Sequence, residues 1–305
     1  MHSHDIDEIF DAFKCISRPE VIPTNDEPDI YLCEEIQQLL SMDLRTIGPH
    51  ELIPYLAHVF VPCGSEADFL YLMPAMLSNW SELIDQAVEA PQDTCAYWFH
   101  AALARKDVLN KCLSPDQKKV VTGFMKRRLL EIISAQRWDL SSADEPNVPK
   151  WPSVFAFFGV ISTDIPECWT RWWAMENEGH LISAVLWSSE LICDFSANPL
   201  YARWRRERKN GWLTLWEMAT EDFGSRWRAE NLEFLQQTLT VKYLTERYDL
   251  ATAKTNDPAF REAITKILAI MQNEPWRTIN RIQELVEAFS TPELPLPAGK
   301  IDWTE

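Results

Sequence analysis

No lysine or arginine occurs between Thr46 and Ala104 of this 305-residue chain. The first hundred residues hold 18 acids against three bases, whereas the remaining residues are nearly balanced, with 28 acids and 26 bases. Soluble surfaces usually mix both signs of charge. The imbalance predicts a negative field that attracts a basic partner and disfavours nucleic acid and anionic membranes. An ordinary acidic surface with no special partner is the alternative at this point.

Glycine, paired cysteines and long apolar runs are also scarce. Only 8 glycines are present, which argues against an all-β fold or glycine-rich loops. The seven cysteines form no CxxC pair, so reduced thiols are expected. The start MHSHDIDEIF lacks the basic and apolar regions of a signal peptide, and no run has the length of a membrane span. These absences predict a cytoplasmic protein.

Motifs that would identify an enzyme are missing. His50-Glu51 has no second histidine one helical turn later, as a zinc protease would require. Glu176 and His180 could share a metal, but no third ligand is near in the sequence. We therefore predict no catalytic residues, no metal site and no cofactor. The alternative is an enzyme or toxic effector whose site is assembled from distant residues, such as Glu176, His180 and Asp194.

The stretch Glu51–Trp80 predicts two helices joined at the corner Pro62–Ser65. Ser65 precedes Asp68 by three residues, the spacing of a capping box, which satisfies N–H groups in a first helical turn. Pro74 lacks an N–H and is expected to bend this helix. An apolar face with the 3.6-residue period of a helix is formed by Phe69, Leu72, Met73, Met76, Leu77 and Trp80.

Apolar periodicity and capping residues predict helices along most of the chain. The clearest is Ser114–Arg137, where Ser114 and Gln117 have capping-box spacing. One side of it is basic, and this side could lie against the acidic first half or contact a partner. That side carries Lys118, Lys119, Lys126, Arg127 and Arg128. The other predicted helices are Asp7–Ile16, Asp29–Met42, Pro49–Val61, Cys95–Val108, Glu167–Cys193, Trp212–Phe223, Arg226–Tyr248 and two that begin at Pro258 and Pro275.

The second part of the chain is rich in tryptophan. The chain has 14 tryptophans in all, and we expect most of them in helix–helix cores, with partner anchors as the alternative use. Four of them, Trp169, Trp172, Trp173 and Trp187, lie in the predicted helix Glu167–Cys193. The last predicted helix is expected to bury Ile279, Ile282, Val286 and Phe289.

These patterns predict an all-α fold with two packed multi-helix halves, resembling an irregular helical-repeat stack. The polar, proline-containing stretch Asp139–Pro152 predicts the boundary between them. The predicted organisation is an acidic helical domain over residues 1–138, a tryptophan-rich helical domain over 153–289 and an extended, proline-rich tail over 290–305.

Two segments resemble a known family. GSEADFLYLMPAML, residues 64–77, and LSPDQKKVVTGFM, residues 113–125, resemble small helical immunity proteins encoded beside bacterial polymorphic and type VI secretion toxins. The resemblance covers residues 40–137. It implies a non-catalytic protein that binds a cognate toxin and blocks it.

Charge and resemblance together predict an immunity protein that neutralises a basic bacterial toxin by occlusion with its acidic half. A helical scaffold or adaptor is a further alternative. We expect Asp29, Glu34, Glu35, Glu66 and Asp68 to be exposed. The predicted partner contacts are Asp26, Glu27, Asp29, Glu34, Glu35, Glu66, Asp68, Glu82 and Asp85.

Overall fold

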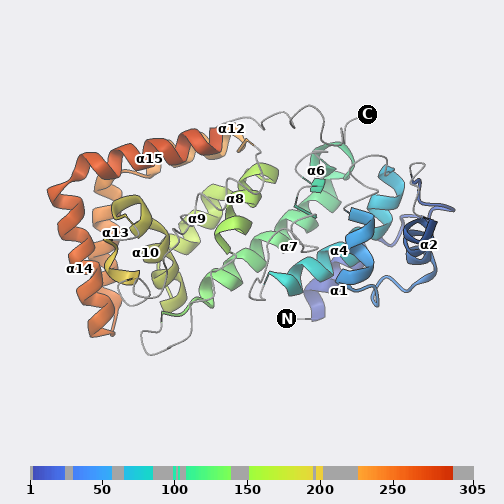
Figure 1. Ribbon diagram of the computed structural model, residues 1–305, viewed down its shortest axis with the longest axis horizontal. Coiled ribbons are helices and arrows are strands. Elements are labelled where there is room, and N and C mark those ends of the chain that lie inside the picture. Colours follow the sequence, from blue (N-terminus) through green and yellow to red (C-terminus); the bar gives the residue numbers. More distant parts are fainter. Residues whose placement is uncertain are drawn as a thin grey trace. The chain divides into compact units, whose positions relative to one another are not determined.

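The computed structural model describes residues 3–24, 30–56, 65–84, 99–100, 102–103, 108–138, 151–194, 197–201 and 226–290. These residues form thirteen α-helices and two 3-10 turns, and no strand occurs among them, which confirms the all-α prediction (Figure 1). The chain divides into two compact units, unit 1 up to Arg128 and unit 2 over Leu129–Glu293. The division falls inside α7 (Pro115–Ser134), and the predicted linker residues 139–150 lie outside the described residues.

Unit 1 is organised around α4 (Glu66–Leu83), which packs against α1 and α3. Its N-cap is Ser65, whose side-chain oxygen accepts from the backbone N–H of Asp68 at 3.3 Å, so the predicted helix start is confirmed. The other described elements of unit 1 are α1 (Ser3–Phe13), α2 (Ile30–Gln38), the 3-10 turn η1 (Leu39–Ser41), α3 (Pro49–Pro54), α6 (Val108–Lys111) and the first part of α7.

The six residues of the predicted apolar face of α4 are all buried, which confirms that face. Burial extends further, because Leu70, Ala75 and Ser81 on other sides of the helix are buried too. A helix that is apolar around most of its circumference can lie inside a unit instead of on its surface. The helix continues through Pro74, and the bend expected there stays a prediction.

Unit 2 places α10 (Glu178–Ile192) against four other helices, α9, α13, α14 and α15. The described elements that accompany α10 are α8 (Trp151–Ile161), α9 (Ile165–Trp173), the 3-10 turn η4 (Pro199–Tyr201), α12 (Ala229–Thr238), α13 (Val241–Lys254), α14 (Pro258–Asn273) and α15 (Pro275–Ser290).

Two predicted long helices are each divided in the structure. The prediction Glu167–Cys193 was wrong, because α9 ends at Trp173 and Met175 has a left-handed φ of 51°. Asn177 then caps α10 by accepting from the backbone N–H of His180. The prediction Arg226–Tyr248 was also wrong, because Thr240 caps α13 in the same way. Short polar side chains compete with the helix for backbone N–H groups, so they start a new helix where the chain turns.

Tryptophan rings form the centre of unit 2. Trp169 stacks on Trp173 with ring centroids 4.7 Å apart, and Trp172 and Trp187 meet Trp169 edge to face. These four side chains are at most 2% exposed. The prediction that they belong to the core is therefore confirmed, and they are not exposed partner anchors.

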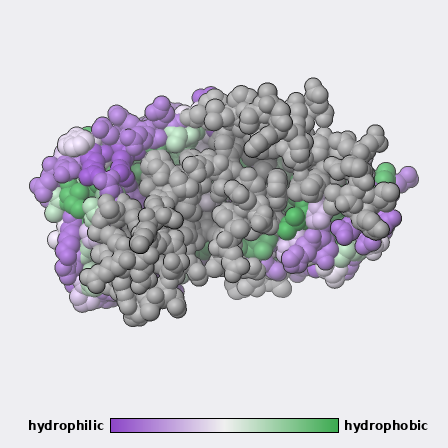
Figure 2. Space-filling view, viewed as in Figure 1, coloured by the Kyte–Doolittle hydropathy of each residue, from purple (hydrophilic) through white to green (hydrophobic). Residues whose placement is uncertain are grey.

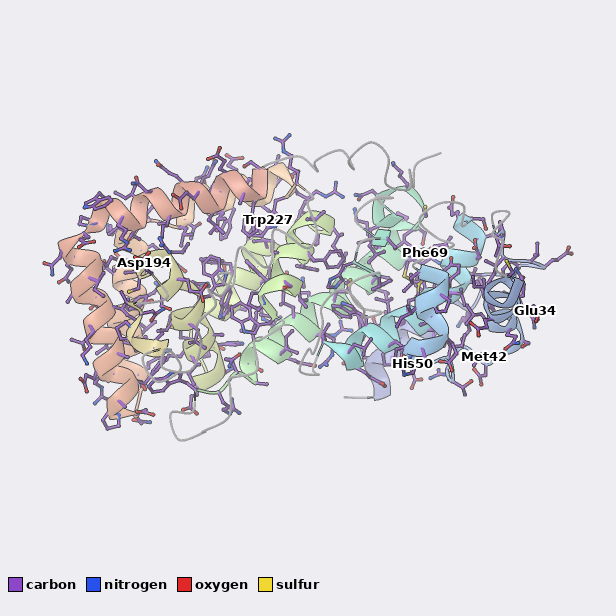
Figure 3. All side chains as sticks on the ribbon, viewed as in Figure 1. Glu34, Met42, His50, Phe69, Asp194 and Trp227 are labelled. Carbon is purple, nitrogen blue, oxygen red and sulfur yellow. The ribbon has the colours of Figure 1, made fainter. Side chains whose placement is uncertain are left out.

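Trp227 approaches Gly159 on α8 so closely that a side chain there would collide with it. A Cβ at position 159 would lie 2.3 Å from the Trp227 indole, which is shorter than any real contact. The indole N–H donates to the carbonyl of Ala156 at 2.8 Å, and the ring stacks on Phe289 of α15 at 4.1 Å. The absence of a side chain at Gly159 thus lets Trp227 join α8 to α15 (Figure 3).

We predict that Gly159→Ala lowers the free energy of unfolding by roughly 1–3 kcal/mol, because Trp227 must shift to admit the methyl group. Denaturant unfolding of the full chain measures this change. Gly123→Ala is the matched control, since a Cβ on that helical glycine meets only the end of Arg127 at 3.6 Å. The control should be neutral or slightly stabilising. Equal midpoints for wild type and Gly159→Ala would contradict the close contact.

Candidate partner-binding surface

The acidic helix α1 is largely neutralised by bases of the same unit. Asp7 pairs with Arg45 at 2.8 Å. Arg127 of α7 lies between Asp5 at 3.0 Å and Glu8 at 2.9 Å. The prediction that the basic side of the 114–137 helix could lie against the acidic first half is therefore confirmed for Arg127. These carboxylates are occupied within the chain, so α1 is a poor candidate for binding an external base.

Several other acids of unit 1 are exposed and make no ion pair with a described base, among them four on α2 and α4. Glu34 and Glu35 lie on α2, and Glu66 and Glu82 lie in the first and last turns of α4. Figure 3 shows Glu34 at the periphery of the unit. We call these four residues the acidic surface. The predicted exposure of Glu34, Glu35 and Glu66 is confirmed, and Glu82 is exposed as well.

Asp68, by contrast, was wrongly predicted to be exposed. Its relative exposure is 0%. It accepts hydrogen bonds from the Ser65 hydroxyl and from Tyr55 Oη, the latter at 3.3 Å. Burial raises the pKa of this carboxyl, and the bonds from Ser65 and Tyr55 only partly oppose that rise. Asp68 therefore stabilises the start of α4 and is not available to a partner. The remaining predicted contacts, Asp26, Glu27, Asp29 and Asp85, lie outside the described residues.

Arg128 also departs from the predicted basic face of α7. It is 6% exposed, and its guanidinium donates to the hydroxyl and the carbonyl of Ser81 at 2.7 and 2.9 Å. The predicted cap of the same helix is confirmed, because Gln117 N–H donates to Ser114 Oγ at 3.3 Å while Ser114 N–H donates to Gln117 Oε1 at 3.1 Å.

His100 is a buried titratable residue that sequence reasoning did not single out. Its Nε2 accepts from the indole N–H of Trp80 at 2.6 Å. Burial lowers the pKa of His100 to about 3, so the imidazole is neutral at physiological pH. No sequence signal could have found this pair, because Trp80 lies 20 positions earlier on another helix.

The length of α10 separates Asp194 from Glu176 and His180, the other two residues of the alternative enzyme site. Glu176 and His180 lie at its N-terminal end, whereas Asp194 lies beyond its C-terminal end. The 15 residues of α10 span roughly 22 Å. Within the part of the chain that the structure describes, no group of three or more histidines, cysteines or carboxylates could hold a metal ion.

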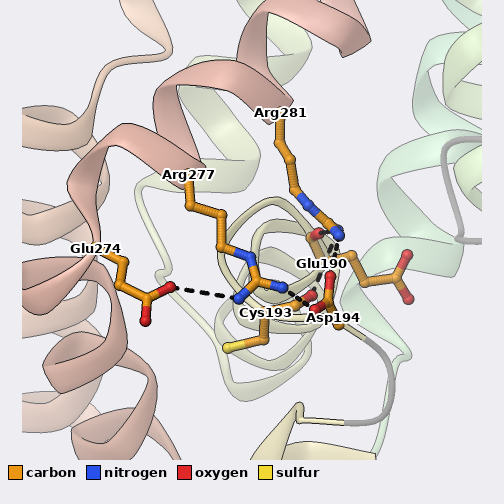
Figure 4. Close-up of polar contacts among 6 residues, drawn as sticks. All are labelled: Glu190, Cys193, Asp194, Glu274, Arg277 and Arg281. Carbon is orange, nitrogen blue, oxygen red and sulfur yellow. Dashed lines mark hydrogen bonds and ion pairs between the residues drawn. The ribbon is translucent and has the colours of Figure 1, made fainter.

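Asp194 instead belongs to an arginine clamp between α10 and α15 (Figure 4). Arg277 and Arg281 both pair with its carboxylate. Arg281 also donates to the carbonyl of Glu190 at 2.7 Å and, more weakly, to that of Cys193 at 3.5 Å. These carbonyls belong to the C-terminal end of α10, where the helix lacks internal donors and favours positive charge. The arginine clamp thus fastens the start of α15 to the end of α10.

The last helix exposes a residue that was predicted to be buried. Ile279 is 46% exposed, and the neighbouring Trp276 is 61% exposed. The predicted burial of Ile282 and Phe289 is confirmed, and Thr278 and Leu285 complete the buried face. α15 packs against α10, α12 and α14. The prediction for Ile279 was wrong because the buried face of α15 is centred on Thr278, Ile282, Leu285 and Phe289, and Ile279 lies to one side of it.

The remaining predictions from the sequence fall partly on residues that the structure does not describe. The five described cysteines, Cys15, Cys33, Cys112, Cys168 and Cys193, form no disulfide, and Cys63 and Cys95 lie outside the described residues. The predicted helix Trp212–Phe223 and residues 291–305 of the predicted 290–305 tail lie outside them as well, whereas Ser290 belongs to α15. No helix in the described ranges is long and apolar enough to cross a membrane.

Comparison of the chain with protein-family models, curated proteins and solved structures gave no match. The resemblance of residues 40–137 to immunity proteins therefore stays a prediction.

The buried His100 predicts a specific pH dependence. Its folded pKa lies below its unfolded value of about 6.5, so the unfolded chain takes up this proton first, and stability falls as pH falls below that value. His100→Gln keeps an acceptor for Trp80 but cannot titrate. Between about pH 7 and 5, wild type should lose about 2 kcal/mol relative to this variant. Urea unfolding at several pH values measures the difference, and parallel curves would contradict it.

We predict that the arginine clamp contributes more to the free energy of unfolding than an exposed ion pair does. Arg281→Met keeps the length of the side chain but removes its hydrogen bonds to α10, which should cost about 1–3 kcal/mol. Lys266→Met is the matched control, because Lys266 pairs with Glu262 on the surface of α14 at 2.7 Å. That loss should stay below about 0.5 kcal/mol. Equal losses in thermal unfolding would show that the clamp adds nothing.

Proposed function

We propose that this chain is a non-catalytic inhibitor that binds a basic partner protein through the acidic surface of α2 and α4. The observation that carries the proposal is the contrast within unit 1. The acids of α1 are paired with Arg45 and Arg127, whereas Glu34, Glu35, Glu66 and Glu82 are exposed without a described base. Unpaired charges of one sign on a surface attract a partner of the opposite sign.

The resemblance to immunity proteins suggests what the partner is. It implies a cognate toxin from a bacterial polymorphic or type VI secretion locus, which this chain would bind and block. Occlusion needs no catalytic group on the inhibitor, only a rigid surface that covers the toxin. The helices of unit 1 provide such a support, because α4 is buried around most of its circumference and capped at its start by Ser65.

The enzyme alternative has less support. It would need Glu176, His180 and Asp194 near one another, but the length of α10 separates them, and Asp194 is held by two arginines.

Charge reversal on the acidic surface tests the proposal. Glu34→Lys/Glu35→Lys/Glu82→Lys changes the net charge from −17 to −11. Glu66 is left unchanged, because its negative charge in the first turn of α4 interacts favourably with the helix dipole and stabilises the helix. We expect this variant to associate with the basic partner protein more slowly than wild type does, by about tenfold or more at low salt. The difference should shrink at about 0.5 M salt, where surface charges are screened.

The matched control reverses three exposed acids of unit 2, Glu233→Lys/Glu246→Lys/Asp249→Lys, which gives the same net charge. It should associate nearly as fast as wild type, and circular dichroism should show intact helices in both variants. Co-expression with a toxic partner should protect cells for wild type and the control only. Equal association rates for both variants, or an acidic partner, would contradict the proposal.

A further inference from the structure

The C-terminal end of α9 is covered by two bases of α13. Arg247 donates from Nη1 to the carbonyl of Trp173 at 3.3 Å. Lys254, about two helical turns later on the same side of α13, donates to the carbonyls of Ala174 and Met175 at 3.1 and 2.9 Å. Carbonyls at the end of a helix lack donors within that helix, so they attract bases. The guanidinium and the ammonium therefore converge on three consecutive carbonyls.

No carboxylate in the described part of the chain pairs with either base. Glu246 and Asp249 are exposed on the same helix, but neither forms an ion pair with Arg247 or Lys254. Glu176, which follows Met175 in the chain, forms none with them either. Two positive charges held at one helix end repel each other, and the partial negative charge of that end offsets the repulsion only in part. A full negative charge would complete the arrangement.

Two buried N–H groups in the same region have no acceptor among the described residues. They are Nε of Arg247 and Nε1 of Trp173, whose side chain is 1% exposed. Both groups lie beside Tyr243, whose ring centroid is 5.2 Å from the guanidinium carbon of Arg247 and 5.5 Å from the ring centroid of Trp173. A buried donor without an acceptor costs free energy. An acceptor that enters from outside the chain would therefore be stabilised here.

Solvent reaches this region from one side. Lys254 is exposed, and Arg247 and Tyr243 are half-buried. On the face shown in Figure 2, mainly hydrophilic residues cover α14 and α15, two helices that pack against α13. A small polar ligand therefore suits this region better than an apolar one.

We propose that Arg247 and Lys254 form a binding site for a carboxylate, carried either by a free small acid or by an acidic side chain of another protein. Because Nη1 of Arg247 is bound to Trp173, the guanidinium presents the edge formed by Nε and Nη2. Two parallel N–H groups on such an edge fit the two oxygens of a carboxylate. Lys254 supplies the second positive charge and a further N–H group. We call these two bases the carboxylate site.

General attraction between charges does not explain binding of an anion by this chain. Its net charge is −17, so an anion is repelled at long range. Binding thus requires the local arrangement of the two bases. The carboxylate site lies in unit 2 and uses none of the residues of the acidic surface, so the proposal goes beyond the proposed function and can fail independently of it.

Potassium succinate is the probe for a free acid, and a short capped peptide with two adjacent glutamates is the probe for an acidic side chain. Each is titrated into the full chain at an ionic strength held constant with potassium chloride, and calorimetry and tryptophan fluorescence give the Kd. Succinamide, which is uncharged, and inorganic phosphate are the comparison ligands. We expect succinate or the peptide to bind at least tenfold more tightly than both, and the tighter of these two probes identifies the source of the carboxylate.

Variants of the two bases locate the binding. Arg247→Lys keeps the charge but loses the bidentate edge, so the Kd should rise about tenfold. Lys254→Gln removes the second charge while its amide can still donate to a carbonyl, and the Kd should rise severalfold. Lys242→Gln is the matched control, because Lys242 is an exposed base of the same helix, and it should leave the Kd unchanged. Circular dichroism checks that each variant keeps its helices.

Three outcomes would overturn this proposal. Neither succinate nor the peptide gives a saturable signal beyond that of succinamide. Arg247→Lys and Lys254→Gln both bind the carboxylate probes as tightly as wild type does. Phosphate binds more tightly than either carboxylate probe, which would assign the two bases to a phosphate group instead.

Discussion

The orientation of α15 depends on one missing side chain. Because Gly159 has no Cβ, the Trp227 indole reaches the backbone of α8 and donates to Ala156, while its other face stacks on Phe289. This contact fixes the end of α15, and the arginine clamp fixes its start. Together they determine which side of the helix is buried. The exposure of Trp276 and Ile279 on α15 is thus tied to a glycine more than a hundred residues earlier in the chain.

The acids of unit 1 differ in their surroundings, and only some of them belong to the proposed binding surface. Acids of α1 are held by Arg45 and Arg127, and Asp68 is buried beneath Tyr55. Among the exposed acids of unit 1 that make no ion pair with a described base are four on α2 and α4. The proposed function rests on this division of the acids, because internal ion pairs weaken the field that a partner meets whereas exposed single charges maintain it.

Features that depend on neighbours in the chain were determined by the sequence itself. The all-α fold, the caps at Ser65 and Ser114 and the buried face of α4 were all predicted, because a cap needs a partner only two or three residues away and a face needs only its period. Tertiary structure alone decided which of the polar and apolar residues would be covered. The burial of Asp68 and Arg128 and the exposure of Ile279 depend on elements distant in the sequence, since periodicity marks an apolar face but not how much of it another helix will cover.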